Sequence, residues 1–528
     1  MNFTKSLLSL LLCALALQPM QSQSMQKYLT AAATTAALGT ATYFTTNKAY
    51  FNSIHWDWEN INPLLIGKQS ITEFLKNHAQ HLNNLQEQNQ WLWGAATSAH
   101  QVESNCTNNQ WNLFVGQELD GKITEPAGLG CDAQNHEDED IKLMKEFGLN
   151  SYRFSIEWSK IYPKQGEINK EELLRYKRFC KKLVANGIQP VVTLYHYTEP
   201  IWFYELGGFE KAENIKYFVE FCTTVYKEMH QEVYLWLTFN APEGIALQGW
   251  LTGSKPPAKK NMMNQAVEVL HNILEAHVAV YRAIKALPEG KNSRVGILKN
   301  ILQLDPWDIC NPLDHLACMF GNRLQNESVY NFLTTGEYTV NIPFKVNYRA
   351  TNNYIKNGGK CLDFIGLNYY CHNYMKLFKT IREPNPEIEI PTNNERYTIY
   401  GEGLNRALHE ISDRIAKPLG IPIYITENGV ATDNDEAGNA LRTLHNQRYI
   451  YAVARAIDEG IDVRGYIHWS LMDNYEWGVY KKFYGLYHVD RSTPELKRSL
   501  KDGAQYYQSV VLGSRIEPKK DSSLRGRL

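Results

Sequence analysis

Eight short β-rich runs alternate with longer helical stretches after residue 91, and this alternation restricts the fold more than any other feature of the sequence. Strands that alternate with helices are typical of a parallel sheet covered by helices. Several helical stretches end in glycine, as helices prefer; they span 139–148, 170–187 and 444–460. Eight parallel strands predict an α/β fold of the (β/α)8 TIM barrel type. The runs span 91–98, 150–158, 189–197, 232–240, 294–300, 363–370, 422–429 and 463–473.

The rest of the sequence supports one barrel over the alternatives. The chain has 528 residues, a length that would ordinarily predict three or four domains, but α/β barrels run as single units beyond the usual domain size. The sequence contains no dinucleotide-binding fingerprint and no phosphate-binding loop, which disfavours a doubly wound sheet. We therefore expect the barrel to occupy residues 88–512.

Both ends of the chain lie outside this predicted barrel. Residues 1–24 hold one lysine and then about ten apolar residues, the pattern of a signal peptide or an N-terminal anchor. Residues 25–87 read as a linker with a second, milder apolar segment that could tether the chain to a membrane, and 513–528 read as a polar tail. We therefore expect an exported protein: periplasmic, secreted or membrane-anchored.

Charge and cysteine spacing limit the class of partner. Lys and Arg total 55 against 56 for Asp and Glu, so no basic face for nucleic acid is implied and a neutral small molecule fits. None of the nine cysteines has zinc-like spacing, so we expect no metal. Export would permit disulfides, with Cys106–Cys131 and Cys310–Cys318 as the pairs in loop-like sequence, whereas Cys180 and Cys222 read as buried helical thiols.

Polar and aromatic residues gather at the carboxyl ends of the predicted strands. This is the rim at which (β/α)8 barrels form their active sites, so the clustering predicts a functional site there. The residues are Gln101, Arg153, His196, Asn240, Asn368, Tyr370, Glu427, Trp469 and Asp473.

The motifs around these residues resemble those of family 1 glycoside hydrolases. They occur in the family's order and cover roughly residues 88–512; they are ATSAHQVES (96–104), SYRFSIEW (151–158), TLYHYTEP (193–200), TFNAPE (238–243), DFIGLNYY (363–370), YITENG (424–429) and WSLMDNYEW (469–477). The resemblance implies a β-glucosidase, β-galactosidase or thioglucosidase type of enzyme whose substrate is a small-molecule or oligosaccharide β-glycoside. No cofactor is implied.

The resemblance also implies catalytic roles. Glu427 would be the nucleophile of a retaining mechanism, and Arg153 and Tyr370 would hydrogen-bond it. Such a mechanism pairs an ionised carboxylate with a protonated carboxylic acid about 5 to 5.5 Å away. A nearby cation and phenol would favour the charged form of the nucleophile.

Sugar contacts follow from the same motifs. Gln101 and His196 would bind hydroxyls, Asn240 would hold the 2-hydroxyl, and Trp469 would form the floor under the ring. Glu476 and Trp477 would bind the edge that carries the 4- and 6-hydroxyls, and Asn368 joins this set. Trp158 and Tyr152 have a competing interpretation as core residues. A carboxylate at Glu476 favours unphosphorylated sugars because it would repel a phosphate, although Lys482 and Tyr484 weakly resemble a phosphate-binding pair.

The sequence departs from the family at one catalytic position. The family has Asn-Glu-Pro where this chain has Asn240-Ala241-Pro242, and the missing Glu is the general acid/base. Ala241 cannot donate a proton, and such help is worth about 10² to 10⁴ in rate. Glu243 could substitute if the strand continued past Ala241, displaced by about 6 to 7 Å.

Three functional hypotheses remain after this departure. The leading one is a retaining β-glycosidase that acts on O-linked, activated or S-linked glycosides. The second is a carbohydrate-binding pseudoenzyme, because a fold and a site can outlast their chemistry. The third is a transglycosylase, which needs the same nucleophile and an acceptor sugar.

Overall fold

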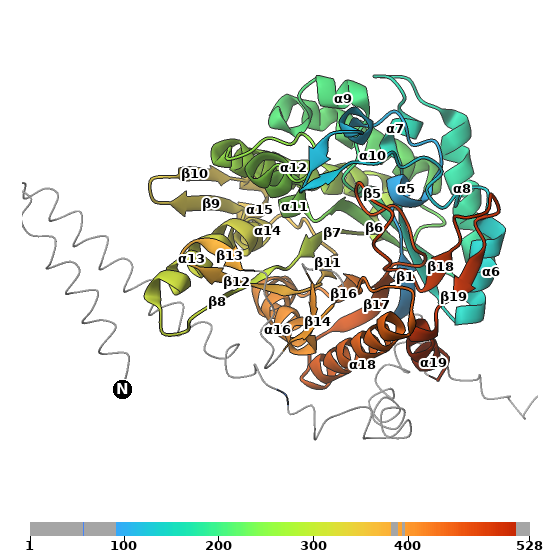
Figure 1. Cartoon of the computed structure of the whole chain (residues 1–528). Coiled ribbons are helices and arrows are strands. Elements are labelled where there is room, and N and C mark those ends of the chain that lie inside the picture. The colour runs from blue at the N-terminus through green and yellow to red at the C-terminus, as the bar shows by residue number, and fades with distance from the viewer. Residues whose placement is uncertain (1–55, 57–90, 382–388, 393–396, 514–528) are drawn as a thin grey trace, which may run out of the picture.

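A closed barrel of eight parallel strands forms the centre of the protein (Figure 1), which confirms the predicted fold. The computed structural model describes residue 56 and residues 91–381, 389–392 and 397–513. Around the barrel the strands follow the order β1-β17-β16-β11-β7-β6-β5-β4. Their bounds are Leu92–Ala96 (β1), Ser151–Ser155 (β4), Gln189–Tyr195 (β5), Leu235–Asn240 (β6), Arg294–Asn300 (β7), Phe364–Asn368 (β11), Ile423–Asn428 (β16) and Val463–Trp469 (β17).

Each strand lies within one of the eight predicted runs, because the runs are rich in the apolar and β-branched residues that a sheet buried on both faces requires. The register of the strands brings their carboxyl ends together. Ala96 pairs with both Trp469 and Arg153, and Asn368 pairs with Glu427. The predicted functional residues therefore meet at one rim of the barrel.

Helices surround the barrel (Figure 1) and cover its outer face. Gly148 ends α6 with a left-handed φ of 97°, as its position after a helical repeat predicts. The longer helices are α6 (Glu137–Phe147), α8 (Lys170–Ala185), α10 (Ile215–Met229), α12 (Met263–Ala286), α13 (Pro312–Asn322), α14 (Ser328–Thr335), α16 (Gly401–Ile411), α18 (Glu436–Asp458) and α19 (Gln505–Gly513).

Short helices and short strands lie in the segments that connect the barrel strands and the longer helices. The helices are α5 (Ala99–Val102), α7 (Trp158–Ile161), α9 (Ile201–Glu205), α11 (Pro242–Ala246), α15 (Asn353–Lys356), α17 (Lys417–Leu419) and the turns η1 (Gln110–Phe114), η2 (Gly208–Glu210), η3 (Ala212–Asn214), η4 (Leu247–Thr252), η5 (Pro288–Asn292), η6 (Arg323–Glu327), η7 (Ser412–Ala416) and η8 (Asp502–Ala504). The strands are β2 (Glu118–Leu119), β3 (Lys122–Ile123), β8 (Gln303–Pro306), β9 (Glu337–Ile342), β10 (Val346–Thr351), β12 (His372–Lys376), β13 (Lys379–Ile381), β14 (Ile390–Pro391), β15 (Thr398–Ile399), β18 (Tyr487–Val489) and β19 (Arg498–Leu500).

The core has an inner and an outer part. Side chains such as Leu235, Leu298 and Phe364 fill the barrel, and a larger aromatic layer packs between the strands and the helices. Trp158 belongs to that layer, with its ring centroid 4.6 Å from that of Phe203. Trp158 is therefore a core residue.

The cysteines described by the structure do not form the disulfides suggested by the sequence. All eight are free thiols. Cys106 Sγ contacts the carbonyl oxygen of Ala99 at 3.8 Å, whereas Cys131 Sγ donates to that of Asp473 at 3.1 Å, so the two thiols point to different partners. In the other pair, Cys310 is exposed and Cys318 is buried. The predicted burial of Cys180 and Cys222 is confirmed.

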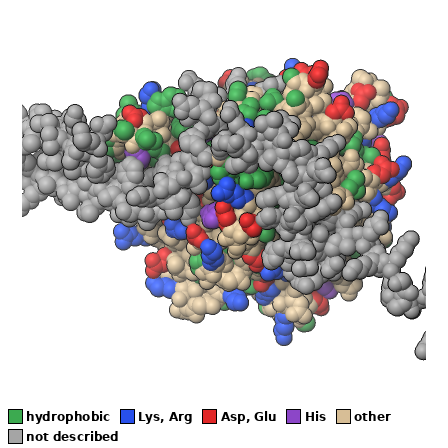
Figure 2. All heavy atoms as spheres, turned by 90° about the horizontal axis from the view of Figure 1, so that it is seen from below, with side chains coloured by type: hydrophobic (Ala, Val, Ile, Leu, Met, Phe, Trp, Pro, Cys, Tyr) green, Lys and Arg blue, Asp and Glu red, His purple; other side chains and the backbone are tan. Residues whose placement is uncertain are grey.

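The terminal segments fall mostly outside the described residues. The signal or anchor at 1–24, the tail at 514–528 and nearly all of 25–87 lie there. The exception is Trp56, which is buried against Tyr451 with the ring centroids 5.3 Å apart. Within the described ranges, no helix has the length and hydropathy that a bilayer crossing needs. Acidic and basic side chains intermingle on the described part of the face in Figure 2.

Candidate active site

Glu427 lies at the carboxyl end of β16 with only 5% of its surface exposed, and two side chains hold its carboxylate. Arg153 Nη1 donates to Oε1 at 2.6 Å, and Tyr370 Oη donates to Oε2 at 2.7 Å. A fully buried cation and a phenol thus occupy both oxygens of the carboxylate. The geometry matches the contacts that the sequence predicts for these three residues.

Arg153 also orients the amides on the neighbouring strands. Its Nη2 donates to Asn240 Oδ1 at 3.0 Å, and Asn368 Nδ2 donates to the same oxygen at 3.1 Å. Asn240 Nδ2 lies 2.9 Å from His196 Nε2. This chain of hydrogen bonds fixes the amide of Asn240 beside Arg153, which holds Glu427.

Aromatic rings form one wall of the site. The His196 ring stacks between Trp469 and Trp477, with centroid distances of 5.7 and 5.9 Å. Burial, together with Arg153, lowers the pKa of His196 well below its usual range, so the imidazole is neutral. Its Nδ1 is buried and has no hydrogen-bond partner among the described residues. Gly429 allows Trp469 to approach, since a Cβ there would lie 1.8 Å from the Trp469 carbonyl oxygen.

Glu476 occupies the opposite edge and is tied to Gln101. Gln101 Nε2 donates to Glu476 Oε2 at 2.7 Å and to the carbonyl oxygen of Tyr475 at 2.9 Å. Burial raises the pKa of Glu476 to about 7, Lys482 and Lys255 oppose that rise, and Glu427 adds to it. The carboxyl group is therefore only partly ionised at neutral pH.

Asp473 is not available to a ligand. Its carboxylate accepts Lys501 Nζ at 2.5 Å, the Gly485 N–H at 2.9 Å and Asn434 Nδ2 at 3.1 Å. We conclude that Asp473 braces the loop after β17.

At the acid/base position the chain turns sharply. Ala241 has a left-handed φ of 48° between the end of β6 and the start of α11 at Pro242. Tyr197 fills space beside it: a Cβ at Gly244 would lie 2.2 Å from Tyr197 Oη and 3.7 Å from Ala241 Cβ. A tyrosine hydroxyl thus lies next to the position from which the family's carboxylate would project.

Glu243 does not lie where continuation of the strand would put it, because β6 stops at Asn240 and a helix follows. Its fully buried carboxylate lies 3.2 Å from the equally buried Lys299 Nζ and accepts the Asn300 N–H at 2.8 Å. Burial raises the pKa of Glu243 and lowers that of Lys299. Glu243 is therefore part of a buried ion pair with β7, which corrects the expectation that it could substitute as acid/base.

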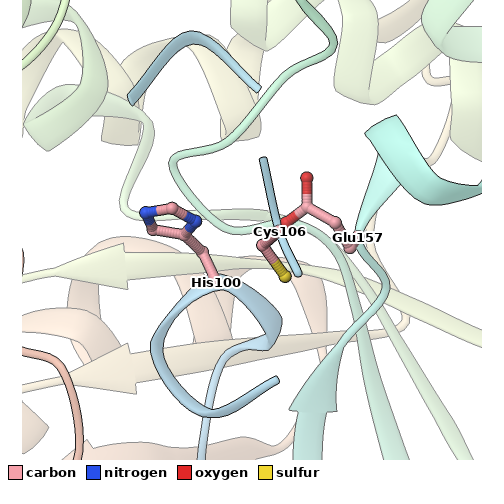
Figure 3. A group of neighbouring side chains, drawn as sticks. All are labelled: His100, Cys106 and Glu157. Atoms are coloured by element: carbon pink, nitrogen blue, oxygen red, sulfur yellow. The ribbon is translucent and has the colours of Figure 1, made fainter. Parts of the chain in front are cut away.

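A second cluster of polar side chains lies nearby (Figure 3), and the ligand atoms of His100, Cys106 and Glu157 lie within 4.8 Å of one another. Both carboxylate oxygens of Glu157 are occupied, by Ser159 Oγ at 2.6 Å and Thr198 Oγ1 at 3.0 Å. Burial raises the pKa of the Cys106 thiol well above its usual range. Other residues also engage the remaining two groups: Asn109 Nδ2 lies 3.0 Å from His100 Nδ1, and Cys106 Sγ contacts the Ala99 carbonyl oxygen at 3.8 Å. The cluster is therefore a poor fit to a metal, which binds cysteine as the thiolate.

Lys255 is a further charged group near the site that the sequence analysis did not identify. Lys255 follows η4 in the Pro-rich segment 253–260, and its Nζ lies 3.3 Å from the centroid of the Tyr197 ring and 4.8 Å from that of Trp477. A single lysine in a polar loop carries no periodic or motif signal. Only the fold brings it to the rim.

A parallel eight-stranded barrel with a buried, doubly hydrogen-bonded carboxylate and an aromatic wall at its carboxyl rim defines the class of (β/α)8 glycoside hydrolases. Residues 84–515 match the model of Glycosyl hydrolase family 1, and the chain belongs to that family.

Relatives of known activity cover most of the chain. Beta-glucosidase A from Thermotoga maritima is 30% identical over 452 residues, which are 81% of this chain and 98% of the relative. A 6-phospho-beta-galactosidase from Clostridium acetobutylicum is 27% identical over 473 residues, which are 81% and 97% of the two chains.

Solved structures agree with the fold. The beta-glycosidase from Pyrococcus horikoshii is 31% identical and superposes with a TM-score of 0.70 over 81% of this chain and 95% of its own. The Thermotoga maritima beta-glucosidase in complex with castanospermine is 28% identical, with a TM-score of 0.71 over 81% and 99% of the two chains.

Proposed function

We propose that this protein is a retaining β-glycosidase that forms a covalent glycosyl intermediate on Glu427 and acts on neutral β-glucosides or β-galactosides. The observation that carries the proposal is the clamp on Glu427, where Arg153 and Tyr370 occupy the two carboxylate oxygens. A retaining mechanism needs an ionised carboxylate at this place.

The surrounding groups suit a sugar ring. His196 offers an unpartnered Nδ1, the indole of Trp469 offers a flat surface, and Gln101 with Glu476 offers donors and acceptors for hydroxyls. Family membership and the beta-glucosidases among the relatives support a β-linked substrate. The partial neutrality of Glu476 and the nearby Lys482 weaken the charge argument against phosphorylated sugars, but Glu476 still favours a hydroxyl at this edge.

Ala241 restricts the leaving group. Without a carboxylic acid on β6, a substrate with an activated or sulfur-linked aglycone departs more readily than one with an alkoxide leaving group. Such substrates would need the nucleophile alone in the first step.

Trapping tests the nucleophile in isolation. We expect a 2-fluoro glucoside with a dinitrophenyl leaving group to modify the peptide that contains Glu427, detected by mass spectrometry, and azide to release the sugar as a β-glycosyl azide. Glu427→Gln is the matched control, since it keeps the size of the side chain and cannot form the glycosyl ester. If the protein is folded and binds a glucoside inhibitor but forms no adduct, the proposal is wrong.

The second candidate is a carbohydrate-binding protein without turnover, and Ala241 is the observation in its favour. In that case inhibitor binding persists in the absence of an adduct. Transglycosylation is the third outcome, recognised by products longer than the donor.

For the N-terminus we propose export through the apolar run in residues 1–24, and mass measurement of the mature protein distinguishes cleavage from retention of an anchor.

A further inference from the structure

We propose that Lys255 takes the role of the missing acid/base: it protonates the leaving group and then activates the water molecule that releases the sugar from Glu427. This inference rests on the proposed function and names a catalytic group for it. The family's second carboxylate would thus be replaced by a lysine from a different loop.

The position of the ammonium group comes from two aromatic rings. Lys255 Nζ lies 3.3 Å from the centroid of the Tyr197 ring and 4.8 Å from that of Trp477. Cation–π contacts of this kind hold a lysine in place without using its N–H groups in hydrogen bonds to carboxylates. The two rings therefore place the Lys255 ammonium group on the face of Tyr197 and beside Trp477.

Tyr197 connects Lys255 to the vacant acid/base position. The Tyr197 hydroxyl approaches Gly244 so closely that a Cβ there would lie 2.2 Å from it, and Ala241 Cβ lies 3.7 Å from the same point. The ring that carries Lys255 therefore borders Ala241. Trp477, the second ring, stacks on His196 in the wall of the sugar site. Lys255 therefore contacts both the tyrosine that borders Ala241 and the tryptophan that stacks on His196.

The electrostatic surroundings suit a group that both gives and takes a proton. Burial lowers the pKa of Lys255 to about 7, Glu476 and Glu427 oppose that change, and Lys482 adds to it. A general acid/base works best when its pKa lies near the operating pH. Lys255 also lines a cavity of about 300 Å³ together with other charged residues, which are Glu199, Glu205, Glu210 and Lys259.

The two steps balance as follows. In the first, a carboxylate oxygen of Glu427 bonds to the anomeric carbon, the bond from that carbon to the aglycone oxygen breaks, and the Lys255 ammonium gives that oxygen its proton. In the second, the neutral Lys255 amine takes a proton from water while the water oxygen bonds to the anomeric carbon. The ester bond to Glu427 breaks, and both side chains regain their starting charges.

Tyr197 is the competing proton donor, since its hydroxyl lies beside Ala241. Burial, Glu243 and Glu427 raise the pKa of Tyr197 well above its usual range, which makes the phenol a weak acid. Tyr197→Phe keeps the ring under Lys255 and removes only the hydroxyl. It is therefore the matched control.

The test compares two substrates in the full chain. The dinitrophenolate group leaves its glucoside without being protonated. The leaving sugar of cellobiose must be protonated as it departs. We expect Lys255→Met to lower kcat/KM for cellobiose by about 10²-fold or more and to leave the burst of dinitrophenol changed by less than about threefold. Lys255→Arg should behave like Lys255→Met because guanidinium does not titrate in this range. Azide should accelerate release of the sugar from Lys255→Met and leave the parent chain unaffected.

Several results would overturn the inference. Parallel losses on both substrates would assign Lys255 to binding, and a loss with Tyr197→Phe but not with Lys255→Met would make the tyrosine the donor. A parent chain that hydrolyses only the dinitrophenyl glucoside would show that no residue supplies the proton. Failure to form the Glu427 adduct in the parent chain is a separate result, which removes the proposed function itself. Inhibitor binding by each variant verifies that it is folded.

Discussion

Arg153 Nη1 and Glu427 Oε1 lie 2.6 Å apart, although 274 positions separate the two residues in the chain. The contact spans the barrel from β4 to β16, and neither side chain reaches solvent appreciably. Removing either partner would leave an uncompensated buried charge. The pair therefore links the stability of the barrel rim to the state of the nucleophile.

Substitution of the proposed nucleophile should remove activity. Glu427→Gln keeps acceptors for Arg153 but cannot form a stable glycosyl ester, so we expect dinitrophenyl glucoside turnover to fall by about 10⁴-fold. Steady-state kinetics measure this change, and inhibitor binding serves as control. Residual activity within tenfold of the parent chain would place the nucleophile elsewhere.

Restoring the family's carboxylate should increase activity on poor leaving groups. Ala241→Glu supplies an acid beside Tyr197, and we expect cellobiose hydrolysis to rise by about 10-fold to 10³-fold, within the range of general acid catalysis. Ala241→Gln fills the same space without an ionisable proton and should show no such gain. Equal rates for the two variants would mean that the position no longer faces the aglycone oxygen.

Loss of the tyrosine donor should weaken catalysis without abolishing it. Tyr370→Phe removes one of the two hydrogen bonds to Glu427, and a hydrogen bond to a charged group is worth about 1.5 to 3 kcal/mol. We expect kcat/KM for dinitrophenyl glucoside to fall by about 10-fold to 10²-fold. Arg153→Lys, which cannot keep the bridge to Asn240, should have the larger effect. The reverse order would contradict the geometry.

The buried pair of Glu243 and Lys299 should matter for stability. Glu243→Gln leaves the Lys299 charge without its partner, and breaking such a pair costs about 3 to 5 kcal/mol. We expect the double variant Glu243→Leu with Lys299→Met to recover much of this loss in the free energy of unfolding, measured with denaturant. An unchanged stability but a selective loss of cellobiose cleavage in Glu243→Gln would return Glu243 to the acid/base role.

Stability should fall with rising pH because of Glu199. Burial raises the pKa of Glu199 to about 8, the hydrogen bond from Tyr195 opposes this, and Glu210 adds to it. The carboxyl pKa is about 4.3 in the unfolded chain, so between that pH and about pH 8 the folded protein keeps a proton that the unfolded chain has released. The stabilisation from Glu199 is therefore fully present below about pH 4 and decreases as the pH rises to about 8.

Glu199→Gln isolates that contribution, because the amide keeps an acceptor for Tyr195 Oη but does not titrate. We expect the unfolding free energy of the variant to decline less steeply than that of the parent chain between about pH 5 and pH 8, by up to about 1.4 kcal/mol per pH unit. Denaturant unfolding at several pH values measures the slopes. Parallel curves would mean that Glu199 ionises normally in the fold.

Much of this site could be predicted from the sequence. The β-rich runs that contain Arg153, Asn240 and Glu427 form strands that are buried along their whole length, and a parallel barrel buries such strands on both faces. Since all parallel strands end at one rim, residues at the ends of the runs had to meet. The family motifs then gave the roles of Gln101 and Trp469 in binding.

Three features could not be predicted from the sequence, because they depend on the direction in which a side chain points and not on the spacing of residues along the chain. Glu243 turned away from the site when the left-handed turn at Ala241 ended β6 and started a helix, and a one-residue change in backbone direction decides which way a side chain points. The cysteine pairs depended on which way each thiol faces. Lys255 reached the site only because its loop folds back over Tyr197 and Trp477.

The sequence by itself determined the barrel, its rim of strand-end residues, the place of Glu427 on that rim and the absence of a carboxylate at Ala241. These properties follow from hydrophobic pattern and residue identity, which act locally along each strand. The tertiary structure alone decided which charges pair: Glu427 with Arg153, Glu243 with Lys299, and Lys255 with two aromatic rings. Pairing energies depend on distance and burial between segments far apart in the chain, and only the closed barrel fixes both.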